Sequence, residues 1–260
     1  MGDILISIDV EEFDLPEEYG IHISEDDKLN IPHQGLQALN QLFSKHQIRA
    51  TYYTTFYFAR HFPELIKELS EQHEIASHGL NHSGFTESDL ATSKKEIEKI
   101  ILKTVFGFRM PRMQEVSTEE IKKAGYVYNS SLNPTWLPFR YNKITSPRLP
   151  FSEGGVFQLP CSVTSYRFPL FWLAFKNMPY SIFRRMALGV LRKEKYLHLY
   201  FHPWEFAAIK HFKVPAYVKK RDGQELLDLL ERLITDLKPE GNFITGMEYV
   251  KQRHQEFDSQ

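Results

Sequence analysis

Two histidines four positions apart occur in EIASHGLNH, residues 74–82, directly after a short apolar run. On a helical turn, His78 and His82 can present their imidazoles to one side and bind one cation. The chain has 11 histidines, so the pair alone is equally compatible with solvated or core residues. A metal site therefore requires a further ligand from elsewhere in the sequence.

Two acids, Asp9 and Glu11, stand at the end of the apolar run ILISIDV, residues 4–10. A carboxylate beside two histidines makes a site with open positions for water and substrate, which suits zinc, iron, cobalt or nickel. A second carboxylate can stay unligated and take a proton from the attacking water. We expect Asp9 to have a functional partner, because an aspartate at the end of a buried strand is costly without one.

Three further residues follow apolar runs. Arg109 ends VFGFR and is the natural partner that would hold Asp9 charged and oriented. His202 ends LHLYFH and can donate a proton to a leaving group near neutral pH, unless it is a structural histidine. Trp204 is equally compatible with a wall of a substrate cleft and with packing at a rim.

The elements that must position these residues alternate between strand and helix patterns. The predicted strands are 4–10, 49–55, 73–77, 105–109, 126–130, 156–162, 195–202 and 242–246, and the predicted helices are 33–46, 62–72, 86–102, 117–125 and 223–238. This alternation predicts an α/β fold with a mostly parallel sheet, closed or nearly closed into a barrel. Catalytic residues of such barrels lie at the carboxyl ends of the strands, where the polar clusters of this chain occur.

The composition narrows the class of protein. With 260 residues, 42% of them hydrophobic, and no Ser/Gly-rich linker, one domain over 1–260 is predicted. A net charge of −1 gives no support for nucleic-acid binding. The only cysteine, Cys161, allows neither an internal disulfide nor a cysteine metal site. The sequence has no signal-peptide pattern and no long apolar stretch, which predicts a cytoplasmic protein.

Five motifs in order resemble the polysaccharide deacetylase family, the NodB-homology or carbohydrate esterase family 4 group. They are IDVEE, the run ending in EIASHGLNH, VFGFRMP, GYVYNSSLNP and YFHPWEF, which together cover most of the chain. The resemblance implies a distorted (β/α)7, TIM-like barrel. It also implies removal of an N-acyl group, chiefly N-acetyl, from an amino sugar in a polysaccharide or in its biosynthetic precursor.

The resemblance assigns roles to single residues. It implies that Asp9 is the general base, that Arg109 orients it and that His202 is the general acid. It further implies that one divalent transition metal, chiefly zinc with cobalt, nickel or iron as alternatives, is bound by Glu11, His78 and His82. We also predict substrate contacts from Pro111, Trp204 and Tyr128.

The chain departs from the usual family pattern at several positions. Val10 separates the two acids, so Asp14 stays a reserve candidate for the carboxylate ligand beside Glu11. Asn129 stands where an aspartate is usual. Arg112 and Met113 replace small or polar residues, which predicts a different cleft floor.

Two other functions stay open on the sequence. One is hydrolysis of another amide, such as a cyclic ureide or a formamido sugar, and the other is a carbohydrate-binding relic without catalysis. The aromatic and then basic stretch 166–195 is compatible with a membrane that carries a lipid-linked sugar, or with a barrel helix whose basic face is solvated. The oligomeric state is left open.

Overall fold

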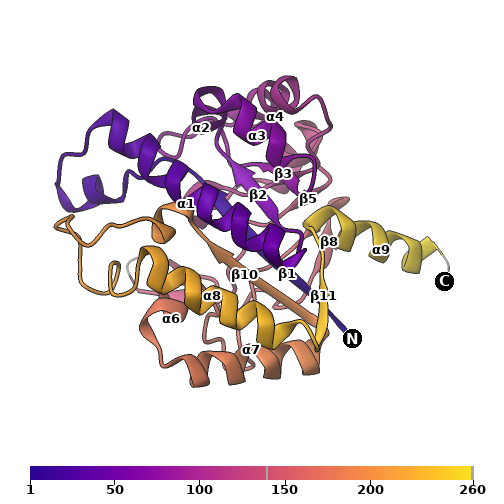
Figure 1. The fold of residues 1–260 in the computed structure, drawn as a ribbon. Coiled ribbons are helices and arrows are strands. Elements are labelled where there is room, and N and C mark those ends of the chain that lie inside the picture. Colours follow the sequence, from indigo (N-terminus) through magenta and orange to yellow (C-terminus); the bar gives the residue numbers. More distant parts are fainter. Residues whose placement is uncertain (139, 259–260) are drawn as a thin grey trace.

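The computed structural model describes residues 1–138 and 140–258. Its centre is a curled parallel sheet in the order β10-β1-β2-β3-β4-β5-β9. The strands are β1 (Gly2–Val10), β2 (Thr51–Thr54), β3 (Glu74–Ser77), β4 (Gly107–Phe108), β5 (Tyr128–Asn129), β9 (Val156–Gln158) and β10 (Tyr196–Phe201). The sheet follows the predicted (β/α)7 arrangement, and the fold class is confirmed (Figure 1).

Smaller strands extend this sheet. β8 (Phe151–Glu153) pairs antiparallel with β9, and β11 (Gly241–Phe243) pairs with the start of β1. A separate hairpin, β6 (Trp136–Leu137) and β7 (Tyr141–Asn142), was not predicted, because two-residue strands carry too little periodicity to detect.

The barrel closes incompletely between β9 and β10. The chain after β9 meets β10 through a few hydrogen bonds: Ser162 N–H donates to His198 O at 2.9 Å, Ser162 Oγ accepts from His198 N–H at 2.9 Å, and the Tyr196 hydroxyl donates to Pro160 O at 2.7 Å. No ladder of paired strands joins β9 and β10 among the described residues. This seam is the distortion of the barrel.

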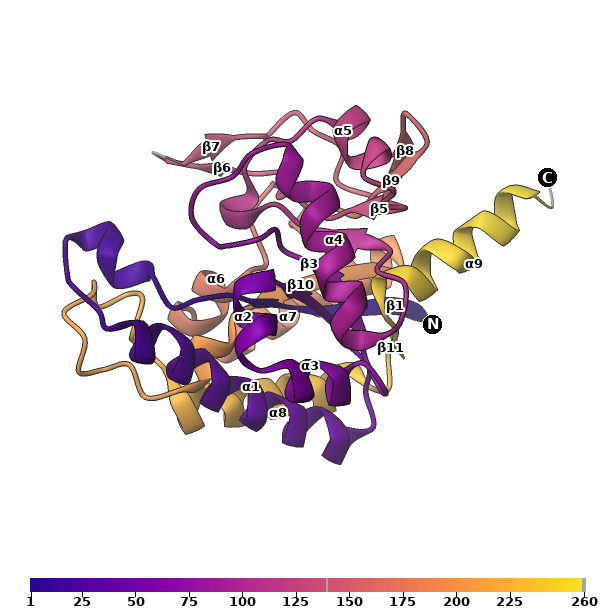
Figure 2. The ribbon, with the colours of Figure 1, turned by 90° about the horizontal axis from the view of Figure 1, so that it is seen from above.

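Helices cover the outer side of the sheet, except for the last one, whose Tyr249 and Val250 pack with Tyr128 inside the barrel. They are α1 (Glu25–His46), α2 (Phe56–His61), α3 (Pro63–Leu69), α4 (Ser88–Ile101), α5 (Thr118–Lys123), α6 (Trp172–Asn177), α7 (Tyr180–Glu194), α8 (Gly223–Leu237) and α9 (Gly246–Asp258). Figure 2 places α1 and α8 on one side of the sheet and α5 with the β6–β7 hairpin on the other. The predicted leucine stripe of α8 is buried at Leu226, Leu230 and Leu233.

Helix α1 begins at Glu25, eight residues before the predicted start at 33. Ser24 caps it by accepting a hydrogen bond from Asp27 N–H at 3.1 Å, and Pro32 lies inside it. Pro32 has no N–H to offer Lys28 O, and that carbonyl instead accepts from Phe13 N–H at 2.9 Å. The proline thus links α1 to the chain that follows β1.

Residues 166–195 contain α6 and α7, as the barrel-helix interpretation expected. Arg185 and Arg192 of α7 are exposed, whereas Trp172 of α6 lines a cavity. Within residues 1–138 and 140–258, no helix combines the length and the apolar character needed to cross a membrane. Contact of 166–195 with a membrane surface stays a prediction.

Candidate metal and acid–base site

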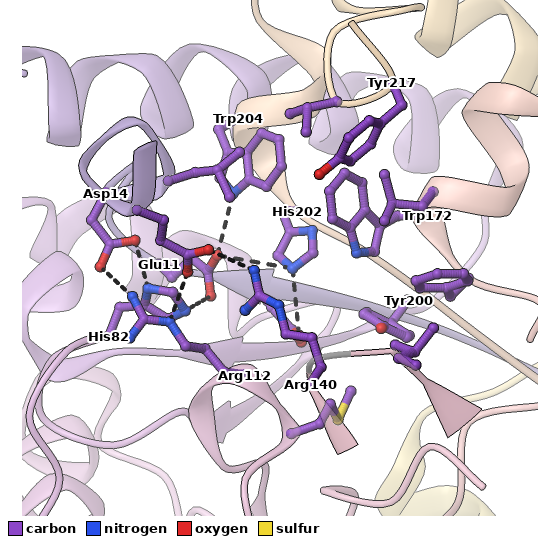
Figure 3. Close-up of a pocket in the computed structure, with 18 of the residues that line it drawn as sticks. Glu11, Asp14, His82, Arg112, Arg140, Trp172, Tyr200, His202, Trp204 and Tyr217 are labelled. Atoms are coloured by element: carbon purple, nitrogen blue, oxygen red, sulfur yellow. Dashed lines mark hydrogen bonds and ion pairs between the residues drawn. The ribbon is translucent and has the colours of Figure 1, made fainter. Parts of the chain in front are cut away.

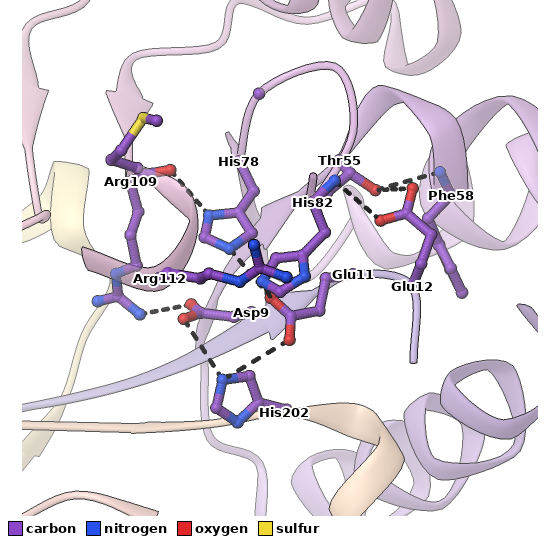
Figure 4. Close-up of polar contacts among 12 residues, drawn as sticks. Asp9, Glu11, Glu12, Thr55, Phe58, His78, His82, Arg109, Arg112 and His202 are labelled. Atoms are coloured by element: carbon purple, nitrogen blue, oxygen red, sulfur yellow. Dashed lines mark hydrogen bonds and ion pairs between the residues drawn. The ribbon is translucent and has the colours of Figure 1, made fainter. Parts of the chain in front are cut away.

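The predicted site residues follow four strands whose carboxyl ends meet. Asp9 belongs to β1 and Glu11 follows it, while His78 and Arg109 come directly after β3 and β4. His202 follows β10, which is the neighbour of β1. Because all these strands are parallel, the side chains come together at one end of the barrel (Figure 4).

Three side chains form a cluster that could hold one metal ion. Nε2 of His78 lies 3.2 Å from Oε2 of Glu11, and Nε2 of His82 lies 3.0 Å from the same oxygen. One ligand atom from each residue falls within 4.8 Å of the other two. Two imidazoles and one carboxylate are a donor set that suits zinc and related transition metals.

The outer nitrogens of both histidines are occupied. Nδ1 of His78 lies 2.8 Å from the backbone oxygen of Arg109, so it carries the proton and donates to that carbonyl. Nδ1 of His82 lies 2.7 Å from Oδ1 of Asp14. Each Nε2 is thereby left toward Glu11, which is the arrangement that metal-binding histidines commonly have. Asp14, the reserve ligand, contacts the outer side of His82, and Glu11 faces the inner side.

The charges of this cluster are strongly coupled. Burial opposes ionisation of Glu11, but the charges of His82 and His202 and the contact with His78 outweigh it and lower the pKa of Glu11 far below its usual range. Burial likewise disfavours a charged His82, yet Glu11 and Asp14 raise the pKa of His82 to about 9. The cluster thus attracts a cation, and a bound metal would replace this proton.

Asp9 is held on one oxygen and free on the other. Its Oδ1 accepts from Nη1 of Arg109 at 2.5 Å, as the sequence predicted. Arg109 is fully buried, donates to the backbone oxygen of Ser130 at 3.1 Å, and lies 4.0 Å from the centre of the Tyr53 ring. Oδ2 of Asp9 faces Nε2 of His202 at 4.0 Å. The free oxygen is therefore available to accept a proton.

His202 is fixed by a carboxylate behind it. Oε1 of Glu205 lies 3.0 Å from Nδ1 of His202 and accepts from its backbone N–H at 2.9 Å. Both belong to the turn η3 (Pro203–Phe206) and its N-cap. Burial works against a charged His202, but Glu11 and Glu205 raise the pKa of His202 above its ordinary value. Nε2, the nitrogen toward Asp9, is thus held ready to carry a proton.

A cavity of about 280 Å³ opens above these groups (Figure 3). Asp9, Glu11 and His202 contribute to its floor. Its wall combines charged and aliphatic side chains with the aromatic residues Tyr19, Tyr141, Phe171, Trp172, Tyr200, Trp204 and Tyr217. Trp204 stacks on His202 with ring centres 4.9 Å apart and donates Nε1–H to Glu11 at 3.2 Å. Trp204 thus belongs both to the wall and to the polar cluster.

Two predicted substrate contacts lie outside the residues that line this cavity. Tyr128 is fully buried, its hydroxyl donates to Glu74 at 2.8 Å, and its ring fits against Gly107 and Gly246 inside the barrel. Tyr128 therefore does not line the cavity, and the prediction that it contacts the substrate was wrong. Pro111 is buried with its ring beside Gly79, next to the site but not among the lining residues.

The departures from the family pattern have structural outcomes. Asn129 lies away from the cavity, where its side chain donates to Gln158 at 2.9 Å and accepts from Ser131 N–H at 3.1 Å. Arg112 and Met113 line the cavity with φ of 57° and 53°. Two successive left-handed residues other than glycine are strained, and such strain is concentrated at functional sites. Arg112 and Met113 thus shape the cavity, and a cleft floor different from that of the family stays a prediction.

Sequence reasoning missed several residues of the site. Glu205 lies in the quoted motif HPWEF, and its spacing of three from His202 was the signal that could have identified it. Lys176 is fully buried 3.3 Å from the other oxygen of Glu205, but nothing in the sequence connects the two. The outer contact of Asp14 with His82 also depends on the folded loop.

Comparison with known proteins supports the same family. The family model for polysaccharide deacetylase matches residues 21–128. No curated protein matches the chain significantly.

Solved structures resemble the whole chain. A protein from Pseudomonas aeruginosa, named as a probable polysaccharide deacetylase, is 14% identical with a TM-score of 0.72, and the match covers 98% of this chain and 91% of that one. A corresponding protein from Mycobacterium smegmatis is 16% identical with a TM-score of 0.67 and the same two coverages, 98% and 91%. The allantoinase PuuE is 13% identical with a TM-score of 0.66, covering 97% of this chain and 90% of that one. At these identities the structural likeness establishes the fold.

Proposed function

We propose that this chain, which belongs to the polysaccharide deacetylase family, is a metal-dependent hydrolase that removes an N-acyl group, chiefly acetyl, from an amino sugar. One observation carries the proposal. A histidine–histidine–carboxylate cluster, an aspartate with one free oxygen and a carboxylate-held histidine surround the floor of one cavity. A cavity with this floor contains the groups that amide hydrolysis by water requires.

Glu11, His78 and His82 would hold the metal, for which zinc is our first choice. A divalent cation there supplies a Lewis acid that polarises the amide carbonyl and lowers the pKa of water. The free Oδ2 of Asp9 accepts the proton of the attacking water, and Arg109 holds this carboxylate in place through Oδ1. Proton transfer to a positioned base typically contributes about 10²–10⁴ in rate.

His202 completes the reaction by protonating the departing nitrogen at Nε2. An amine leaves as a neutral molecule only after it gains a proton, so the acid must stand near the base that started the reaction. The 4.0 Å between Asp9 Oδ2 and His202 Nε2 leaves both groups within reach of one amide bond. Trp204 stacks on His202 and Trp172 packs edge-on against both rings, so the two tryptophans cover part of the imidazole.

Hydrolysis of another amide is the second candidate. The same base, acid and metal ligands would open a cyclic ureide or release formate from a formamido sugar. The small volume of the cavity and the tryptophans and tyrosines in its wall are the observation that favours a flat ring as an alternative to an acetamido sugar. Acetate release, formate release and ring opening, measured side by side, distinguish the three. A binding relic is disfavoured, because all six predicted reacting or metal-binding residues are brought together.

Metal content tests the proposal first. We expect about one zinc or related metal per wild-type chain by elemental analysis, and loss of that metal in His82→Ala. The exposed His61 provides the matched control, and His61→Ala should keep the metal. Asp9→Asn should also keep the metal but lose about 10²–10⁴ in turnover on the amide that proves active. Absence of metal in wild type after incubation with zinc would overturn the proposal.

A further inference from the structure

Four segments that are far apart in the sequence are connected around the mouth of the cavity. They are η1 (Leu15–Tyr19), η2 (Pro111–Met113), the β6–β7 hairpin and the loop that contains Tyr217. Each contributes side chains to the cavity wall. Figure 3 shows Tyr217, Arg140 and Arg112 around the opening above Glu11 and His202. We call these four segments the rim.

Polar contacts tie the rim segments to one another. The hydroxyls of Tyr19 and Tyr217 lie 3.0 Å apart and join η1 to the Tyr217 loop. Glu18 contacts Arg140 of the hairpin at 2.5 Å and Arg112 of η2 at 3.1 Å. The rim is thus bridged on the side of the loop and on the side of the hairpin.

Two further contacts anchor the ends of this rim. Lys143, just after the hairpin, donates to the backbone oxygen of Met113 at 2.9 Å. Asn177 at the end of α6 donates to the backbone oxygen of Tyr217 at 2.8 Å. Single exposed contacts of this kind are individually weak. Here they connect consecutive segments, so opening the mouth for a long ligand requires several of them to break.

The volume of the cavity, like the bridged rim, limits the size of the substrate. This volume of about 280 Å³ lies just below the usual range for small-molecule sites, about 300–1,000 Å³. A polymer that is cleaved at an internal residue needs a groove with two exits, because the chain continues on both sides of the reacting unit. A bridged rim around a cavity of this volume accommodates one ring-sized unit instead.

We infer that the substrate carries its acyl group on a free or terminal sugar unit, and that internal residues of a long polymer are excluded by the rim. The inference rests on the proposed function for its reaction and on the bridged rim for its selectivity. Tyr217 is then a specificity residue, because its ring forms the wall and its hydroxyl forms the bridge to Tyr19.

N-acetylglucosamine oligomers of one to six units, offered to the zinc-loaded protein, are the probe. We expect kcat/KM not to rise with chain length and no more than one acetate released per chain. Tyr217→Ala should raise kcat/KM for the hexamer at least tenfold relative to the monomer, and Tyr217→Phe should do so less. Tyr166, which is 96% exposed elsewhere, gives the control Tyr166→Ala, expected to behave like wild type.

A binding measurement separates this inference from the proposed reaction. Trp172 and Trp204 line the cavity, so their fluorescence reports occupancy in Asp9→Asn without turnover. If Asp9→Asn binds monomer and hexamer with equal affinity but wild type releases no acetate, the selectivity for a single sugar unit is upheld and the proposed deacetylation is rejected. Affinity or kcat/KM that increases with each added unit, several acetates per chain, or no binding at any length would overturn the inference.

Discussion

Glu205 supports His202 from behind, and its other oxygen faces the buried ammonium of Lys176 at 3.3 Å. Both side chains are fully buried, and the Lys176 nitrogen lies 5.5 Å and 5.7 Å from the ring centres of Trp172 and Trp204. A buried charge that loses its partner typically costs about 3–5 kcal/mol. At the residue scale, the position and charge of His202 therefore depend on two groups that never face the cavity floor.

Removing the Glu205 charge should change the pH profile of turnover. Glu205 contributes to the raised pKa of His202, so in Glu205→Gln this pKa falls. A general acid must be protonated to act, and the alkaline limb of kcat/KM should therefore move to lower pH. The measurement is the pH dependence of kcat/KM with the substrate found above.

A double variant distinguishes a change in the pKa of His202 from a loss of folding. Glu205→Gln alone leaves Lys176 buried without a counter-charge, whereas Glu205→Gln with Lys176→Met removes both charges. The double variant should fold more stably than the single one and show the same displaced limb. An alkaline limb at the wild-type pH in both variants would contradict the role of Glu205.

At the scale of elements, α1 and η3 pack unusually closely at Gly35. A Cβ atom at this position would lie 1.8 Å from the carbonyl oxygen of Pro203 and 2.7 Å from its carbonyl carbon. Because His202 is the N-cap of η3 and Trp204 lies inside it, the absence of a side chain at Gly35 lets α1 set the position of the acid and of the cavity wall.

Gly35→Ala should destabilise the fold and lower turnover together. The backbone at Pro203 must shift, and overpacking of this kind typically costs about 1–3 kcal/mol. Gly189 of α7 has no atom within 4 Å of an added Cβ, so Gly189→Ala should instead stabilise by about 0.4–1 kcal/mol without affecting turnover. Urea unfolding and kcat/KM of both variants check this. Equal stability of the two would refute the close contact.

The elements were predictable to different degrees. The strand ends at Asp9, His78, Arg109 and His202 could be identified because long apolar runs precede polar residues there. The start of α1 was missed because the capping signal of Ser24 lies eight residues before a proline. The β6–β7 hairpin and α9 lack a strong periodic pattern, and the Tyr19–Tyr217 bridge depends on loops that meet only in the folded chain. Sequence therefore predicted the floor of the site better than its mouth.

At the scale of the whole molecule, a buried histidine links folding to pH. His73 precedes β3, is 7% exposed, and lies among aromatic rings, with its Nδ1 accepting from Ala50 N–H at 3.3 Å. Burial lowers the pKa of His73 to about 4. In the unfolded chain, His73 has an ordinary histidine pKa near 6.5. Between pH 4 and pH 6.5, His73 is therefore mostly protonated in the unfolded chain and mostly neutral in the folded chain.

Stability should fall as the pH drops below about 6.5, because protons then favour the unfolded state. Between pH 7.5 and 5.0, His73 should account for about 2 kcal/mol of the lost unfolding free energy. His73→Gln removes this contribution and should flatten the dependence, whereas the exposed His61→Gln should follow wild type. Urea unfolding at the two pH values measures it, and identical slopes for all three proteins would refute the assignment.

The unpaired seam between β9 and β10 has a consequence for how this protein can change. The proposed base, acid and metal ligands all come from the arc β10-β1-β2-β3-β4, while the chain from β5 to the seam supplies walls and the hairpin. This stretch also supports the reacting groups at its two ends, because Ser130 O accepts from Arg109 at 3.1 Å and Ser162 contacts His198 of β10, whereas the β6–β7 hairpin between them contributes to the cavity wall. Exchanging the hairpin alone would alter which molecules are admitted and leave intact what is done to them.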